Sequence, residues 1–244
     1  MKFLRFAALA ILATLGHPLA GLPAFAATTS QLQTRARSLA LDVGSSRQRY
    51  TDATILIWLN EAQRFAVTDA KPLLKSGSFE LVVGSTYYAM PSDFLQAYRV
   101  SLDFDVLEET TPEALDRQDR WQETSAEPTH YFIHWASRTK MGVYPWPESS
   151  GSTGTVRYEY YAQVTDLSAA GDSPFNGVTE LSPYHDSLAY YAAARMSALD
   201  GRTDLAVLYM AEFRAGVERM GREARMRPVY RPAASAASRD GPNR

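Results

Sequence analysis

Residues 181–220, LSPYHDSLAYYAAARMSALDGRTDLAVLYMAEFRAGVERM, predict two helices joined by a tight corner. Ser182 is placed to cap the first helix, and Pro183 then occupies its first turn, where no backbone N–H is required. Asp200-Gly201 ends this helix because glycine adopts the left-handed conformation of a helix end at little cost. A connection this short makes the two helices antiparallel.

Both helices carry apolar residues at steps of three and four, so each has one apolar face. The faces consist of Leu188, Tyr191, Ala192, Met196 and Leu199 in the first helix and of Leu205, Leu208, Tyr209, Phe213, Val217 and Met220 in the second. A hairpin of two helices cannot bury both faces alone. The rest of the chain is therefore expected to supply what packs against them.

Two N-terminal segments are the expected partners. Residues 28–43 begin with a capping box of Thr28 and Gln31, and residues 51–70, TDATILIWLNEAQRFAVTDA, begin at Thr51. Ile55, Trp58, Leu59, Ala62, Phe65 and Ala66 are expected to face the core, and Asn60, Glu61, Gln63 and Arg64 to face water. The four expected long helices are thus 28–43, 51–70, 182–200 and 203–222.

Between the helical pairs the apolar period changes to two, which is typical of strands. The clearest alternation is Tyr98, Val100, Leu102, Phe104 and Val106, which predicts one continuous strand. The sequence therefore predicts an α+β fold over residues 27–225. Its parts are an antiparallel helical bundle built from both ends of the chain and a small antiparallel β-sheet inserted over about 78–162. Residues 226–244 follow as an extended tail, because they are rich in Arg, Pro, Ala and Ser and show no apolar stripe.

The first 26 residues resemble a signal peptide. Lys2 and Arg5 precede an apolar run of about ten residues, which is too short to span a bilayer. Ala24-Phe25-Ala26 has the small-x-small form that a signal peptidase accepts. A leader of residues 1–26 implies export to the periplasm, and the alternative is a buried or frayed N-terminal helix.

The composition is that of an ordinary globular protein, with 244 residues, 45% hydrophobic and 21% charged. It contains no cysteine, so a disulfide framework and a thiolate metal site are excluded. The formal net charge of −2 gives no support for nucleic-acid binding by the whole surface. The tail differs, because it holds five Arg and one Asp from Arg225 onward. Binding to DNA phosphates, docking on a neighbouring protein and no role at all remain open, and its Pro and Ala content favours docking on protein.

No residues form a convincing catalytic, cofactor or metal site. His130 and His134 fall on a predicted strand, which places them about 13 Å apart, too far to share a metal ion. His185-Asp186 lies in a first helical turn, where the helix dipole explains Asp186 and surface placement explains His185. Glu108-Glu109 is interpreted as a solvated strand end rather than as a carboxylate pair. The sequence therefore predicts a protein that is not an enzyme and needs no cofactor.

Aromatic residues are numerous, and most are interpreted as core residues or cross-strand pairs. They are Tyr87, Tyr88, Tyr144, Trp146, Tyr158, Tyr160, Tyr161, Tyr190 and Tyr191. An excess of Tyr and Trp also occurs at protein interfaces. An exported periplasmic binding module that uses an aromatic sheet face is therefore kept as an alternative function.

Several separated pieces together resemble one family. They are TDATILIWLNEAQRFAV, GSTYYAMPSDF from Gly84 to Phe94, GVYPWP after the PTHYFI strand, and the C-terminal helical hairpin. In this order and spacing they resemble the head–tail adaptor (connector) proteins of tailed bacteriophages, including the tail-tubular-protein-A type. The resemblance covers about residues 28–220.

The resemblance implies a ring of identical chains, usually twelve, that is not enzymatic. Such a ring lies under the portal protein in the virion neck and passes DNA to the tail nozzle or tube without sequence-specific binding. Family members commonly grip the portal with a C-terminal tail, which here implies partner-binding roles for Arg225, Arg227, Tyr230 and Arg231. An acidic body agrees with a channel that should not hold DNA.

Overall fold

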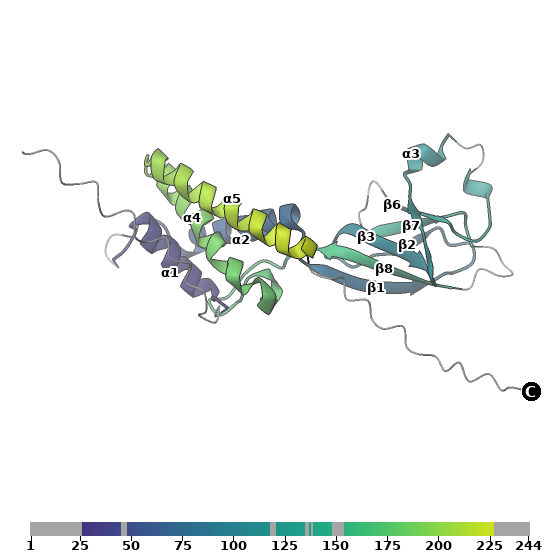
Figure 1. The fold of residues 1–244 in the computed structure, drawn as a ribbon, viewed down its shortest axis with the longest axis horizontal. Helices are drawn as coiled ribbons and strands as arrows, with labels where there is room; N and C mark the ends of the chain where they lie inside the picture. The colour runs from purple at the N-terminus through teal and green to yellow at the C-terminus, as the bar shows by residue number, and fades with distance from the viewer. Residues whose placement is uncertain are drawn as a thin grey trace, which may run out of the picture.

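The computed structural model describes residues 26–44, 48–117, 121–134, 137, 139–147 and 154–226. Residues 1–25 of the expected leader and residues 227–244 of the expected tail lie outside the described residues. Figure 1 shows an elongated molecule in which long helices gather at one end and strands at the other. We call these two ends the helical lobe and the strand lobe.

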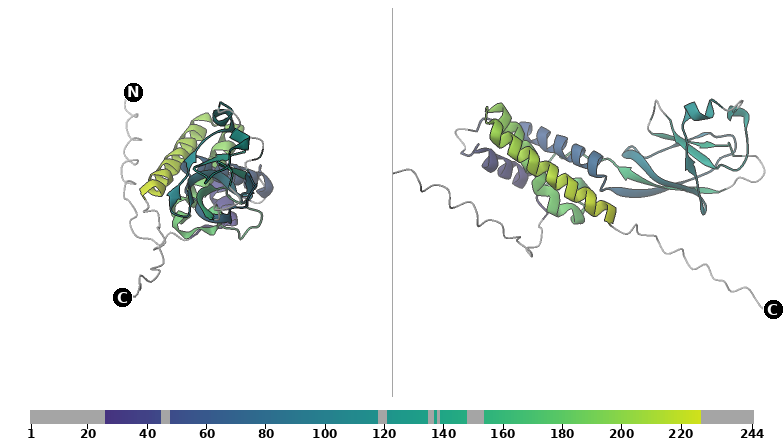
Figure 2. Two further views of the ribbon diagram at one scale, coloured as in Figure 1. Left: turned by 90° about the vertical axis from the view of Figure 1, so that its right-hand side faces the viewer. Right: turned by 45° about the horizontal axis from the view of Figure 1, so that its top comes forward.

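Four of the five α-helices in the described residues form the helical lobe (Figures 1 and 2). They are α1 (Thr29–Ala40), α2 (Asp52–Ala70), α4 (His185–Leu199) and α5 (Thr203–Met226). Thr28 caps α1 through a capping box with Gln31, and Thr51 caps α2 by accepting the Thr54 N–H. The fifth helix, α3 (Pro112–Leu115), is a single turn in the strand lobe.

The start of α4 differs from the prediction. A 3-10 segment, η3 (Thr179–Tyr184), precedes it, and α4 begins at His185 with Tyr184 at the N-cap position. Ser182 therefore does not cap α4, although its carbonyl accepts the His185 N–H. Pro183 lies inside η3, whose tighter winding accommodates a residue that donates no backbone hydrogen bond.

The strand lobe contains two four-stranded sheets rather than the single small sheet that was predicted. The first has the order β1 (Leu74–Glu80), β8 (Thr155–Ala162), β3 (Phe94–Leu102) and β4 (Asp105–Val106). The second has the order β2 (Tyr87–Ala89), β7 (Lys140–Tyr144), β6 (His130–Ile133) and β5 (Glu108–Glu109). The α+β class is right, but the predicted helical bundle with one inserted antiparallel sheet is wrong. One pairing, β5 with β6, is also parallel.

One backbone position explains part of this error. The alternating run over 98–106 is a hairpin, because Asp103 adopts a left-handed conformation with φ of 49° and turns the chain between β3 and β4. Asp103 N–H bonds to the Thr155 carbonyl, which fixes the turn against β8. Phe104 at the tip is 86% exposed, so its place in the alternation does not reflect burial.

The main core runs through both lobes. In the helices it contains Leu32, Ile55, Leu59, Leu188, Met196 and Phe213, and in the first sheet Val100, Val156, Tyr158 and Tyr160. A smaller cluster of Leu115, Trp121, Phe132 and Tyr144 lies under α3. The apolar faces of the helices and one face of the sheet thus belong to one continuous core. Burial of this core stabilises both lobes together.

The side of α2 that was predicted to face water is partly buried. The connector over residues 163–178 packs there, and both Asn60 and Gln63 lie beneath it. Gln63 Nε2 donates to the Thr165 carbonyl at 2.9 Å. The opposite error also occurs, because Phe65, Leu199 and Leu208 from the predicted apolar faces are more than half exposed.

Candidate interaction surfaces

The C-terminal end of α5 lies where the helical lobe meets the first sheet. Gly221 packs against α2, since a Cβ on it would lie 3.4 Å from Ala70 Cα and 3.7 Å from Arg225 Nη2. Burial raises the pKa of Tyr161 on β8, and the nearby Arg225 charge opposes this rise. Arg225, the first of the predicted partner-binding residues, is therefore an exposed cation at the junction of the lobes.

The other predicted partner-binding residues, Arg227, Tyr230 and Arg231, lie outside the described residues. The segment that contains them starts directly after Met226 at this junction. Their predicted role therefore stays a prediction, to which the structure adds the place where the segment begins.

Apolar side chains are exposed on the outer surfaces of the helical lobe. Ile57 on α2 and Val207 on α5 are 57% and 66% exposed. Phe65, two turns beyond Ile57, has its ring centroid 5.7 Å from that of the buried Phe213, and half of its surface remains open to solvent. Exposed apolar residues that recur along a helix are typical of surfaces that contact another protein. Ile57 and Val207 lie beside the predicted apolar stripes, so the apolar periodicity alone did not identify them.

A second apolar group lies at the end of the strand lobe that is farthest from the helices. Val82 and Val83 follow β1, while Phe104 and Val106 belong to the β3–β4 hairpin, and all four are at least half exposed. Gly154 lies near both segments, because its carbonyl accepts the Leu81 N–H and a Cβ on it would approach Leu102 and Asp103. The two segments therefore flank the same end of β8.

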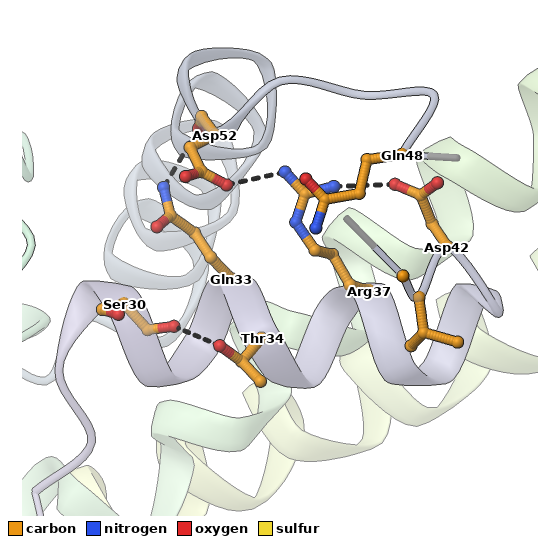
Figure 3. A pocket seen from close by; sticks show the side chains of 9 residues that line it. Ser30, Gln33, Thr34, Arg37, Asp42, Gln48 and Asp52 are labelled. Atoms are coloured by element: carbon orange, nitrogen blue, oxygen red, sulfur yellow. Dashed lines mark hydrogen bonds and ion pairs between the residues drawn. The ribbon is translucent and has the colours of Figure 1, made fainter. Parts of the chain in front are cut away.

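The helical lobe also has a polar hollow of about 330 Å³ between α1 and the start of α2 (Figure 3). Arg37 lies in it, with Nη1 2.7 Å from Asp42 Oδ2 and Nη2 2.6 Å from Asp52 Oδ1. Gln33 Nε2 donates to the Asp52 carbonyl at 3.0 Å. The Arg37 charge is thus fully compensated, and we interpret the group as a structural tie between α1 and α2.

A second group of polar contacts links the loop between α1 and α2 to the corner between α4 and α5. Asp200 at the end of α4 accepts hydrogen bonds from Arg49, Tyr50 and Arg202, at 2.7, 2.9 and 2.9 Å. Burial would raise the pKa of Asp200, but these hydrogen bonds outweigh it and hold the pKa below its ordinary value. Arg202 also donates to the Ala40 carbonyl. The corner between α4 and α5 is therefore hydrogen-bonded to both ends of the loop that connects α1 to α2.

The predicted surface position of His185 is wrong. The side chain is buried against Phe175, and Nδ1 lies 3.2 Å from the Ala27 carbonyl oxygen. Because η3 replaces the expected first turn, His185 points into the lobe and not to solvent. Asp186 is half exposed and pairs with Arg35 at 3.2 Å.

The remaining predicted polar residues do not converge on one point. His130 Nε2 lies 3.7 Å from Glu108 Oε2, and the two belong to the neighbouring strands β6 and β5. Burial raises the pKa of Tyr131 to about 12, with a contribution from the neighbouring Glu109 carboxylate. Among the described residues, no three His, Cys, Asp or Glu side chains are arranged to hold a metal ion.

Most of the nine aromatic residues named from the sequence serve packing. Tyr88 stacks on Phe79, with ring centroids 4.2 Å apart. Tyr158 and Tyr160 are buried in the core. Burial raises the pKa of Tyr160 to about 12, and its hydroxyl bonds Asp93 at 3.0 Å, which adds to the rise. Tyr87 is a partial exception, because it is 43% exposed.

No helix in the described part of the chain is long and apolar enough to cross a membrane. A family model described as SU10 adaptor protein matches residues 27–236. The matched range includes every helix and strand of both lobes. No curated protein matches the chain.

Proposed function

Since this chain belongs to the SU10 adaptor protein family, we propose that it forms the ring that joins the portal of a bacteriophage head to the tail. Membership makes the chain a bacteriophage adaptor, a structural protein of the virion. In this ring, identical copies, twelve in number, surround a channel in the virion neck. DNA passes through this channel to the tail nozzle or tube without sequence-specific contacts.

The family match carries this proposal, and two features of the molecule support it. The helical lobe exposes Ile57, Phe65 and Val207, which are suited to burial between neighbouring copies. A ring needs two different faces of each copy to meet, because its contacts are heterologous. The formal net charge of −2 is in keeping with a channel that does not retain DNA.

We further propose that Arg225, Arg227, Tyr230 and Arg231 contact the portal. The C-terminal segment leaves α5 at the junction of the lobes, where Arg225 is exposed. Arginine and tyrosine are enriched where proteins bind each other. Arg225→Glu combined with Arg227→Glu should weaken portal binding, while Arg219→Glu, an exposed change earlier in α5, should not.

Electron microscopy of the purified full-length chain, alone and with portal, tests the ring. We expect closed rings or ring-capped portals. Ile57→Glu should abolish them and leave the circular dichroism spectrum unchanged, because this side chain is 57% exposed. Arg64→Glu, an exposed change on the same helix, is the matched control. A chain that stays monomeric and ignores portal would overturn the proposal.

A further inference from the structure

A groove of about 530 Å³ lies where the chain passes from the first sheet to the second. Its apolar lining is formed by Leu102, Val106, Leu107 and Pro128. Leu102, Leu107 and Pro128 are buried, whereas Val106 is 56% exposed and open to a partner. The volume is in the range that holds several side chains of a bound ligand.

The rim of the groove is acidic. Asp105, Glu108 and Glu127 line it and are exposed, and the groove contains no Lys or Arg among its described lining residues. Among these described residues the one imidazole is that of His130, whose Nε2 lies 3.7 Å from Glu108 Oε2. The groove therefore favours an occupant that combines apolar side chains with positive charge.

The chain itself contains a segment with this chemistry. Residues 227–232, RPVYRP, place Val229 and Tyr230 between two arginines. Two prolines favour an extended backbone that loses little entropy on docking. We propose that the groove receives residues 227–232 of a second copy of this chain, with Arg227 and Arg231 facing the acidic rim and Tyr230 on the apolar lining.

The geometry of one chain favours a second copy over the chain's own segment as the source of the occupant. The segment follows Arg225, whose charge acts on Tyr161 near the end of β8, whereas Leu102 at the groove pairs with Val156, five residues nearer the start of β8. Five residues of strand and two strand spacings amount to about 20 Å, and extended chain needs about six residues to cover that distance. Residues 227–231 would then still be short of the groove, whereas a second copy has no such restriction.

The contact joins two copies without another virion protein, so it goes beyond the proposed function. It uses the residues that the proposed function assigns to the portal, and the two contacts therefore exclude each other. A C-terminal segment held in the groove of a neighbour is released when portal takes its place.

Crosslinking of full-length chains tests the contact, because the sequence has no native cysteine. One copy carries Val229→Cys and a second, tagged copy carries Val106→Cys. A short bis-maleimide should link the two copies, and the mixed product is resolved on a gel by its mass. The matched acceptor is Val43→Cys, which is 62% exposed near the C-terminal end of α1, away from the strand lobe.

We expect the Val229→Cys copy to be crosslinked about tenfold faster to the Val106→Cys copy than to the Val43→Cys copy. Electrostatic steering of the basic segment toward the acidic groove implies this difference in rate. Asp105→Lys with Glu108→Lys should abolish this preference, and Arg227→Glu with Arg231→Glu in the donor should restore it. Equal rates at both acceptors would overturn the inference, and so would a charge exchange that restores nothing. Portal binding is measured separately, so failure of the proposed function leaves this result readable.

Discussion

Asn60 and Leu167 lie 107 residues apart in the sequence and bond to each other in both directions. The Asn60 Nδ2 donates to the Leu167 carbonyl at 3.0 Å, and the Leu167 N–H donates to Asn60 Oδ1 at 2.7 Å. The Asn60 side-chain amide thus pairs with the backbone N–H and carbonyl of Leu167, as a neighbouring backbone segment would. It holds this irregular segment against α2, and so helps to fix how the chain returns from the strand lobe to α4.

We expect Asn60→Ala to destabilise the protein by about 2–4 kcal/mol, because it leaves the buried N–H and carbonyl of Leu167 unsatisfied. Urea unfolding monitored by circular dichroism measures the change. Arg64→Ala is the control, since its ion pair with Asp166 is half exposed on both sides and should contribute less than about 1 kcal/mol. Equal losses for the two variants would mean that the amide does not anchor the connector.

Replacing Arg37 tests the tie between α1 and α2. Arg37→Met leaves the Asp42 carboxylate buried without its cation, so we expect a loss of about 3–5 kcal/mol. Adding Asp42→Asn should recover part of that loss by removing the charge. Asp52→Asn alone should cost less than about 1 kcal/mol, because the Asp52 side chain is largely exposed. A mild effect of Arg37→Met with no recovery in the double variant would contradict this description.

Two glycines of α5 should respond in opposite directions to alanine. A methyl group on Gly216 would overlap the Ser187 side chain on α4, so Gly216→Ala should destabilise the protein by about 1–3 kcal/mol. A methyl group on Gly221 would meet Ala70 at an ordinary contact distance, and Gly221→Ala should stabilise by up to about 1 kcal/mol through helix propensity. Thermal unfolding distinguishes the two. Stabilisation by Gly216→Ala would show that α4 and α5 pack less closely than described.

His185 should make stability depend on pH. Burial lowers its pKa, against smaller opposing effects of the Ala27 carbonyl and the Asp186 carboxylate. The unfolded chain therefore binds a proton more readily than the folded chain below about pH 6.5. The contribution of neutral His185 to the free energy of unfolding is therefore fully present above that pH. It is lost as the pH falls toward and through the lowered pKa of the folded state.

Thermal unfolding between pH 7.5 and pH 5 measures this effect. We expect the melting temperature of the wild-type chain to fall more over this interval than that of His185→Asn, whose side chain does not titrate. Asp200 does not interfere, because its pKa lies below its ordinary value of about 3.9 and its contribution is lost only at lower pH. Parallel pH profiles for both proteins would rule out a buried neutral histidine.

Local signals predicted the helices well and the strands less well. The Thr28 and Thr51 caps each depend on residues within three positions, so they follow from the adjacent sequence. The alternation over 98–106 predicts extended backbone, but it does not reveal the turn at Asp103, which depends on the Thr155 carbonyl of a distant strand. The burial of Asn60 and His185 likewise depends on segments far away in the chain.

The candidate surfaces divide in the same way. Order and spacing of sequence pieces were sufficient for the adaptor family, and composition was sufficient to mark the basic C-terminal segment. The groove could not be predicted, because its residues come from β3, β4, β5 and the start of β6. The stretches 102–108 and 127–130 meet there through the parallel pairing of β5 with β6, which brings Glu108 opposite His130.

The amino-acid sequence alone therefore established the α+β class, the Thr28 and Thr51 caps, most of each helical apolar face, and the family. All of these depend on neighbouring residues or on the order of segments along the chain. Folding in three dimensions established the two-sheet arrangement, the place of β8 between β1 and β3, and the surfaces that stay exposed. The reason is that strand pairing and burial depend on contacts between residues far apart in sequence, and periodicity carries no information about which partner is chosen.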